Sequence, residues 1–163
     1  MNDRTETPGE DTVTAITDAV LTASRLLVSL SARSIAGVDE SITIPQFRVL
    51  VVLDTLGPLN LASLAHHLGV RPSAMTRMVE RLVQAGLTSR EPSRSTRREF
   101  SIELTAHGRA VVGEVTDRRR REIGAVVERM PPKRRSGLVW ALSAFAEAGG
   151  EPGSLATAEA YWA

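Results

Sequence analysis

Residues 61–87 read LASLAHHLGVRPSAMTRMVERLVQAGL, and they contain two helical patterns separated by a short turn. Asn60 is a good N-cap for the first pattern, which ends at Gly69. Pro72 opens the second pattern, which ends at Gly86. Two helices joined by a turn of about three or four residues that contains glycine are typical of a helix-turn-helix. The stretch therefore predicts this motif, with its second helix over residues 72–85.

The second predicted helix has an apolar face and a face of hydrogen-bonding side chains. The outer face comprises Ser73, Thr76, Arg77, Glu80, Arg81 and Gln84. A helix fits the major groove of DNA, where Arg77 can make a bidentate contact to guanine worth about 1–3 kcal/mol of discrimination. A solvated amphipathic helix is the alternative interpretation. The turn before the helix and the basic hairpin after it favour DNA reading, with Arg71 as a phosphate partner.

A β-hairpin is predicted directly after the reading helix. Residues 87–91 and 99–104 form its strands, and Phe100, Ile102 and Leu104 are expected to point inward. Its polar tip is basic, with Arg94, Arg97 and Arg98 in or beside it. Arginine side chains suit the negative potential of a minor groove, and we expect Arg97 to insert there. A tip that keeps the strand edge soluble is the alternative, as is a salt bridge for Arg98.

The flanking segments predict long helices. Apolar residues recur at helical spacing from Val13 to Ala36, and residues 45–56 are apolar on nearly every side, so that this second helix must be buried. Thr105 caps a helix that runs to about Met130, and a last helix is expected over residues 132–148. The terminal helices are more apolar than one small module requires. We therefore predict that they interlock with a second copy of the chain.

Composition narrows the function classes. The chain has 163 residues, of which 42% are hydrophobic and 24% charged, as in an ordinary globular protein. It has no cysteine, which excludes disulfides, thiolate metal sites and a cysteine nucleophile. The net charge is only +1, yet residues 71–98 hold seven arginines against two glutamates. No apolar run approaches the roughly 20 residues of a membrane span and no signal peptide is evident, which predicts a cytoplasmic protein.

The sequence gives little support for metal binding, cofactor binding or catalysis. His66 and His67 point about 100° apart on a helix, and no histidine pair has i, i+4 spacing, so we expect no metal. Phosphate loops, dinucleotide-binding glycines and a nucleophile elbow are all absent from the sequence, which predicts a protein without cofactor that is not an enzyme. The run from Asp117 to Glu122 wraps around its helix and is expected to be mostly solvated surface. The cations of residues 133–135 have no assigned role.

The order of elements and residues 61–87 resemble the MarR family of bacterial transcription regulators. Thr76-Arg77, Gly86-Leu87 and Leu104-Thr105 followed by Gly108 are the more specific matches. Ser93 and Thr96 stand where the family usually has acidic wing residues, so that a charged partner for the wing arginines is missing. The resemblance implies a homodimeric repressor on a pseudo-palindromic operator, released by a small aromatic or anionic ligand. It places that ligand near the first, second and fifth helices, with Phe47 and Arg48 as candidates and packing as the alternative for Phe47.

The sequence as a whole predicts a mainly α fold with a small β-hairpin wing, made of a winged helix-turn-helix domain and a helical dimerisation region. The predicted divisions are a leader over residues 1–11, a dimerisation helix over 12–42, the DNA-binding domain over 43–104, linking and dimerisation helices over 105–148, and a tail over 149–163. The predicted DNA contacts are Arg71, Ser73, Thr76, Arg77, Arg81, Arg94, Arg97 and Arg98. A winged-helix module that binds protein alone and a metal-responsive regulator remain the alternative functions.

Overall fold

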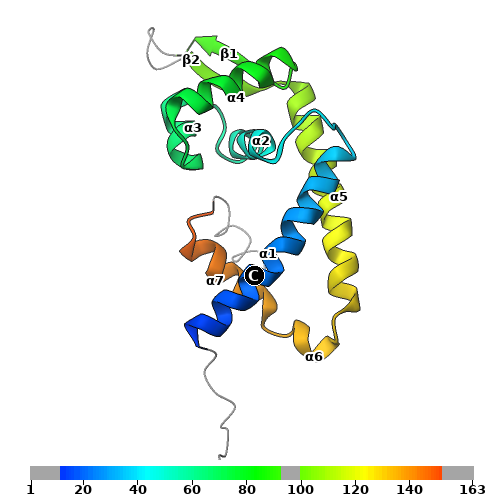
Figure 1. Ribbon diagram of the computed structural model, residues 1–163. Helices are drawn as coiled ribbons and strands as arrows, with labels where there is room; N and C mark the ends of the chain where they lie inside the picture. Colours follow the sequence, from blue (N-terminus) through cyan, green and yellow to red (C-terminus); the bar gives the residue numbers. More distant parts are fainter. Residues whose placement is uncertain (1–11, 93–99, 152–163) are drawn as a thin grey trace, which may run out of the picture.

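The computed structural model describes residues 12–92 and 100–151, and within them the chain is mostly helical (Figure 1). Its elements are α1 (Val13–Ala36), α2 (Ile44–Leu56), α3 (Leu61–Leu68), α4 (Pro72–Gln84), β1 (Thr88–Pro92), β2 (Phe100–Leu104), α5 (Ala106–Arg129), α6 (Pro132–Arg135) and α7 (Leu138–Ala148). The two strands pair antiparallel, from Thr88 opposite Leu104 to Pro92 opposite Phe100. The predicted mainly α fold with a β-hairpin wing is confirmed.

The helices of the helix-turn-helix begin and end beside Asn60, Gly69 and Pro72, as predicted. The Asn60 side chain accepts a hydrogen bond from the Ser63 amide at 2.8 Å and so caps α3. Gly69 ends α3 in the left-handed conformation, with φ of 62°, which glycine adopts without steric cost. Arg71 gives α4 no side-chain cap, but Pro72 occupies the first turn, where a missing amide hydrogen costs nothing.

The helix-turn-helix and the hairpin, together with α2, form a unit over residues 43–104, called the reading module, and its core forms around α2. Val49 and Leu50 of α2 are fully buried, and α3, α4, the hairpin and the first half of α5 enclose them (Figure 1). Ile102 is buried too, and its backbone forms an isolated antiparallel bridge with Leu59, which precedes α3. Phe100 was predicted to point into this core, and that prediction was wrong because it is 61% exposed. It lies at the end of the hairpin that is farther from the core.

Gly108 is the point where α5 touches the end of the reading helix. The Thr105 hydroxyl donates to the Gly86 carbonyl oxygen at 2.7 Å, and the Thr105 amide donates to the Leu87 carbonyl oxygen at 3.1 Å. A Cβ added to Gly108 would collide with this same Leu87 oxygen, which is backbone and cannot swing away. The close approach of α5 to the start of β1 therefore requires glycine.

We expect Gly108→Ala to lower the free energy of unfolding by about 3 kcal/mol, because the added methyl group must push two backbone segments apart. Urea unfolding followed by circular dichroism measures this. Gly113→Ala is the matched control, since the same helix leaves open space at that position. Alanine favours a helix over glycine, so the control is expected to gain up to about 1 kcal/mol. Equal effects of the two variants would contradict the packing role of Gly108.

The end of the chain differs from the single helix predicted over residues 132–148. Gly137 has φ of 79° and separates α6 from α7, because a residue in the left-handed conformation cannot continue a right-handed helix. The Arg135 guanidinium donates to the Met130 carbonyl oxygen at 2.8 Å and to the Glu128 carbonyl oxygen at 2.7 Å. One of the unassigned cations thus satisfies carbonyl groups at the end of α5.

Apolar side chains remain exposed on α1 and α7. Those more than 40% exposed on the two helices are Val13, Ile16, Leu21, Leu26, Leu27, Val28, Val139, Trp140, Leu142 and Phe145. In the described part of the chain, α1 is the helix that is long and apolar enough to cross a membrane by length and composition. The expectation that no segment approaches such a length was wrong, since α1 has few charged side chains along its 24 residues.

Candidate nucleic-acid interface

Helix α4 lies at the surface of the reading module with its two faces separated as predicted. Met75, Val79 and Leu82 are buried. Ser73 and Arg77 are exposed, whereas Thr76 is half-buried and its hydroxyl donates to the Pro72 carbonyl oxygen at 3.0 Å. Ser73 and Arg77 are therefore open to a ligand, and Thr76 keeps acceptor capacity on its hydroxyl oxygen.

A cleft of about 670 Å³ runs between α4 and the start of α2. Its lining comprises Thr43, Pro45, Gln46, Val70, Arg71, Ser73, Ala74, Arg77, Met78 and Arg81. Three of these side chains are guanidinium groups and none is a carboxylate, so that the cleft has a positive potential. The structure thus brings together Arg71, Ser73, Arg77 and Arg81 of the predicted DNA contacts.

The start of α2 forms the opposite wall of this cleft and is held firmly. The Thr43 hydroxyl accepts from the Gln46 amide at 3.4 Å, and the Gln46 side-chain oxygen accepts from the Thr43 amide at 2.9 Å. This reciprocal pair is a capping box. A second hollow of about 360 Å³ shares Thr43, Gln46 and Arg81, and it continues toward the end of α4. The arginine-lined surface therefore follows α4 for most of its length.

The wing arginines Arg94, Arg97 and Arg98 lie outside the described residues, as do Ser93 and Thr96. The two strands that carry the hairpin are described, and they end at Pro92 and Phe100, which pair with each other. Arg90 lies exposed on β1. The role predicted for the three wing arginines stays a prediction.

The two ligand-site candidates have different surroundings. Phe47 is 3% exposed and belongs to the core, in agreement with the packing role considered for it. The exposed Arg48 side chain forms an ion pair with Glu151, with 3.3 Å between Nη2 and Oε2. This pair links α2 to the residue that follows the glycines at the end of α7. Whether either residue contacts a ligand stays a prediction.

Sequence reasoning missed Arg119, which was expected to belong to a solvated charge run. Arg119 is half-buried, and its guanidinium carbon lies 5.3 Å from the centroid of the Phe47 ring. The overlooked signal is the position of Arg119 on the buried face of α5. Val112 and Val115 are buried, and Arg119 follows them by seven and four residues, at the spacing of one helix face.

Comparisons with known proteins agree on one family. The model of the MarR family matches residues 42–100. The HTH-type transcriptional repressor Rv2887 of Mycobacterium tuberculosis is 39% identical over 70 residues, which are 43% of this chain. The chain spans about half the length of the curated relatives it matches.

Two solved structures of proteins from Mycobacterium tuberculosis are similar over most of the chain. The crystal structure of RV1404 from Mycobacterium tuberculosis is 61% identical, covers 88% of this chain and 98% of its own, and has a TM-score of 0.81. The MarR family protein RV2887 in complex with p-aminosalicylic acid is 25% identical, covers 80% of this chain and 97% of its own, and has a TM-score of 0.62. The elements, their order and their arrangement are thus those of known proteins.

Proposed function

This chain belongs to the MarR family, and from that premise we propose that it is a homodimeric transcription regulator that binds a specific double-stranded DNA sequence. The observation that carries the proposal is the arginine-lined surface of α4. Arg71, Arg77 and Arg81 line one cleft without a carboxylate among its lining residues, beside a helix exposed along its polar face. Such a surface suits a DNA groove, where cations meet phosphates and the helix meets base edges.

Selection from random duplexes followed by sequencing tests this function. A dimer with twofold symmetry places two copies of α4 about one helical turn, or 34 Å, apart on the DNA. We therefore expect a pseudo-palindromic sequence with half-sites about ten base pairs apart. The genomic DNA that the purified protein retains supplies an independent test for the same motif. Duplexes that show no enrichment over the starting pool would contradict sequence-specific binding and favour a module that binds protein alone.

The homodimer is supported by the exposed apolar side chains of α1 and α7. Monomeric proteins rarely expose contiguous apolar patches larger than a few hundred Å². The N-terminal half of α1 and helix α7 lie on the side of the molecule away from α4 in Figure 1, so that a second copy can cover them and leave α4 free. Burial of side chains such as Leu27 and Trp140, which are 48% and 69% exposed, would stabilise the pair through the hydrophobic effect.

We also propose that a small organic anion releases the DNA, so that the protein acts as a repressor under ligand control. The relative Rv2887 is named a transcriptional repressor, and its structure was solved with p-aminosalicylic acid. In this chain the Arg33 guanidinium pairs with Glu122 at 3.0 Å and Arg118 donates to the Gly37 carbonyl oxygen at 3.3 Å, which ties α1 to α5. A ligand can shift the spacing between the two reading helices only if it binds one arrangement of α1 and α5 more tightly than the other.

Arg97→Ala tests the wing. We expect it to weaken binding to sites flanked by A·T base pairs and to lower the slope of log affinity against log salt by about one unit, because one cation no longer meets the DNA. Fluorescence anisotropy over a salt series measures the slope. The matched control is Arg134→Ala, which removes an exposed cation from α6 and should leave the slope unchanged. A normal slope for Arg97→Ala would count against wing insertion.

A further inference from the structure

The hairpin extends beyond the body of the reading module, and Phe100 lies on the part that does so. Ile102 exchanges two backbone hydrogen bonds with Leu59, at 2.8 Å and 3.2 Å, so that the segment before α3 covers the edge of β2 at this residue. Ile102 is fully buried, whereas Phe100, two residues nearer the hairpin end, is 61% exposed. Strand alternation puts both side chains on one face. The face that belongs to the core at Ile102 therefore continues outward as an exposed aromatic surface.

The two faces of the hairpin differ in charge, because residues that pair across the strands lie on the same face. The face of the aromatic ring, called the Phe100 face, comprises Thr88, Arg90, Pro92, Phe100, Ile102 and Leu104. The opposite face comprises Ser89, Glu91, Ser101 and Glu103. Among these strand residues, the Phe100 face has one guanidinium group and no carboxylate, and the opposite face has two carboxylates. A polyanion such as DNA is attracted to the first face and repelled by the second.

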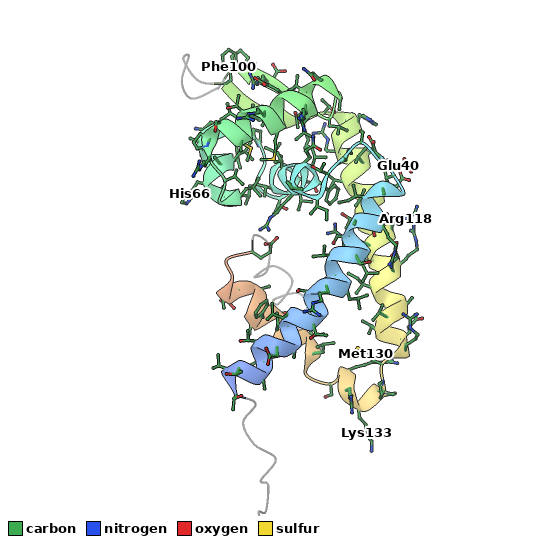
Figure 2. All side chains as sticks on the ribbon, in the orientation of Figure 1. Glu40, His66, Phe100, Arg118, Met130 and Lys133 are labelled. Atoms are coloured by element: carbon green, nitrogen blue, oxygen red, sulfur yellow. The ribbon has the colours of Figure 1, made fainter. Side chains whose placement is uncertain are left out.

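The hairpin holds a fixed position relative to the reading helix. The Leu87 amide donates to the Leu82 carbonyl oxygen at 2.9 Å, which ties the start of β1 to the last turn of α4. Helix α4 and strand β1 also pack against each other. Figure 2 shows Phe100 at the outer end of the hairpin, and α4 lies on this same side of the module, away from α1 and α7. A duplex that lies along α4 is thus within reach of the hairpin end.

We propose that Phe100 packs against a deoxyribose of the DNA backbone beside the minor groove, and that Arg90 on the same face pairs with a neighbouring phosphate. A deoxyribose presents C–H groups to its surroundings, and the hydrophobic effect favours burial of an aromatic ring against them. The contact reads no base, so that it adds affinity for any duplex. The inference rests on the DNA binding proposed above and adds to it a contact that is not electrostatic.

A salt series separates this apolar contact from an ion pair. We expect Phe100→Ala to weaken binding to the selected and to the scrambled duplex about tenfold at every salt concentration, because both rings of the dimer lose their contact. The slope of log affinity against log salt should stay unchanged, since a neutral ring releases no counterions. Phe100→Leu keeps an apolar side chain and should lose less than about threefold. Fluorescence anisotropy measures the affinity and the slope.

Arg90→Gln is the matched variant on the same face, and it should lower the salt slope by about one unit where Phe100→Ala does not. The melting temperature of Phe100→Ala should equal that of the wild type, because the ring is largely exposed in the free protein. Wild-type affinity for Phe100→Ala, or a lower slope for it, would overturn the ring contact. So would a loss of binding that follows a lower melting temperature in both Phe100 variants. An unchanged slope for Arg90→Gln would overturn the phosphate contact.

Photo-cross-linking tests the position of the ring directly. The benzophenone of a Phe100→p-benzoylphenylalanine variant reacts with C–H groups that it touches, so irradiation should attach the protein to the bound duplex. The control is Lys133→p-benzoylphenylalanine, at the opposite end of the molecule in Figure 2, which should not attach to DNA. Attachment of position 100 to protein alone would overturn the proposal and assign the ring to a protein partner. A Phe100-dependent rise in 2-aminopurine fluorescence would replace the sugar contact by insertion between bases.

The contact and the proposed function can fail separately. A wild type that selects a DNA sequence, but whose residue 100 neither cross-links to the duplex nor affects affinity, keeps the proposed function and refutes the Phe100 contact. A wild type that enriches no sequence, while Phe100→Ala still weakens its binding to bulk duplex about tenfold, refutes sequence-specific regulation and keeps the contact.

Discussion

Replacement of Arg77 by alanine is expected to reduce affinity for the selected operator by about 2–6 kcal/mol, which is about 30-fold or more. Each copy of the dimer loses one bidentate contact worth about 1–3 kcal/mol, and a pseudo-palindromic site registers the loss twice. The side chain is exposed in the arginine-lined cleft and does not hold α4 in place, so the fold should be unaffected. Fluorescence anisotropy with the selected duplex and with a scrambled duplex measures the change.

Arg77→Lys is the control for the geometry of this contact. Lysine keeps the charge but cannot present the planar pair of donors, so we expect it to retain affinity for scrambled DNA and to lose discrimination. If Arg77→Ala weakens binding to both duplexes equally, Arg77 contacts phosphate and does not read bases. No loss on either duplex would contradict the DNA-reading role of α4.

Trp140→Ala is expected to raise the dissociation constant of the dimer about a thousandfold. Trp140 is 69% exposed in the single chain, and a buried tryptophan at the centre of an interface typically contributes about 2 kcal/mol or more. Twofold symmetry removes two such side chains, or about 4 kcal/mol in total. Sedimentation velocity over a dilution series measures the shift from dimer to monomer.

Phe100→Ala is the matched control for this dimer test. Phe100 is also a large apolar side chain and 61% exposed, but it lies at the far end of the hairpin, away from α1 and α7 (Figure 2). We expect the dimer to be unaffected by its loss. If Trp140→Ala and Phe100→Ala dimerise alike, the apolar surface of α7 does not form the interface.

The sequence predicted the reading module closely because local rules set its boundaries. Asn60, Gly69 and Pro72 each have a conformational or capping preference that acts within a few residues, and α3 and α4 begin and end beside them. The same holds for the predicted Thr105 cap of α5. Where a residue decides structure through its own backbone, a single sequence is enough.

The predictions that failed concern residues whose role depends on distant parts of the chain. Alternation along the strand predicted that Phe100 lies on the same face as Ile102. How far the core extends beneath that face depends on how α2 and α3 pack, and the core does not reach Phe100. Arg119 was hidden in a run of four arginines, and only the phase of α5 relative to α2 separates it from its neighbours. The break at Gly137 lay between the cations of residues 133–135 and the apolar residues that begin at Leu138, and the stretch reads as one helix because a single glycine there is compatible with either structure.

The bonds between Thr105 and the end of the reading helix, together with the close approach at Gly108, make α5 a lever arm for the DNA-reading head. Helix α5 has 24 residues and is therefore about 36 Å long. A tilt of about 5° around its far end would move the head by about 3 Å, close to the rise of one base pair along B-DNA. In the proposed dimer, a small rotation would thus be amplified into a mismatch with the pitch of the operator.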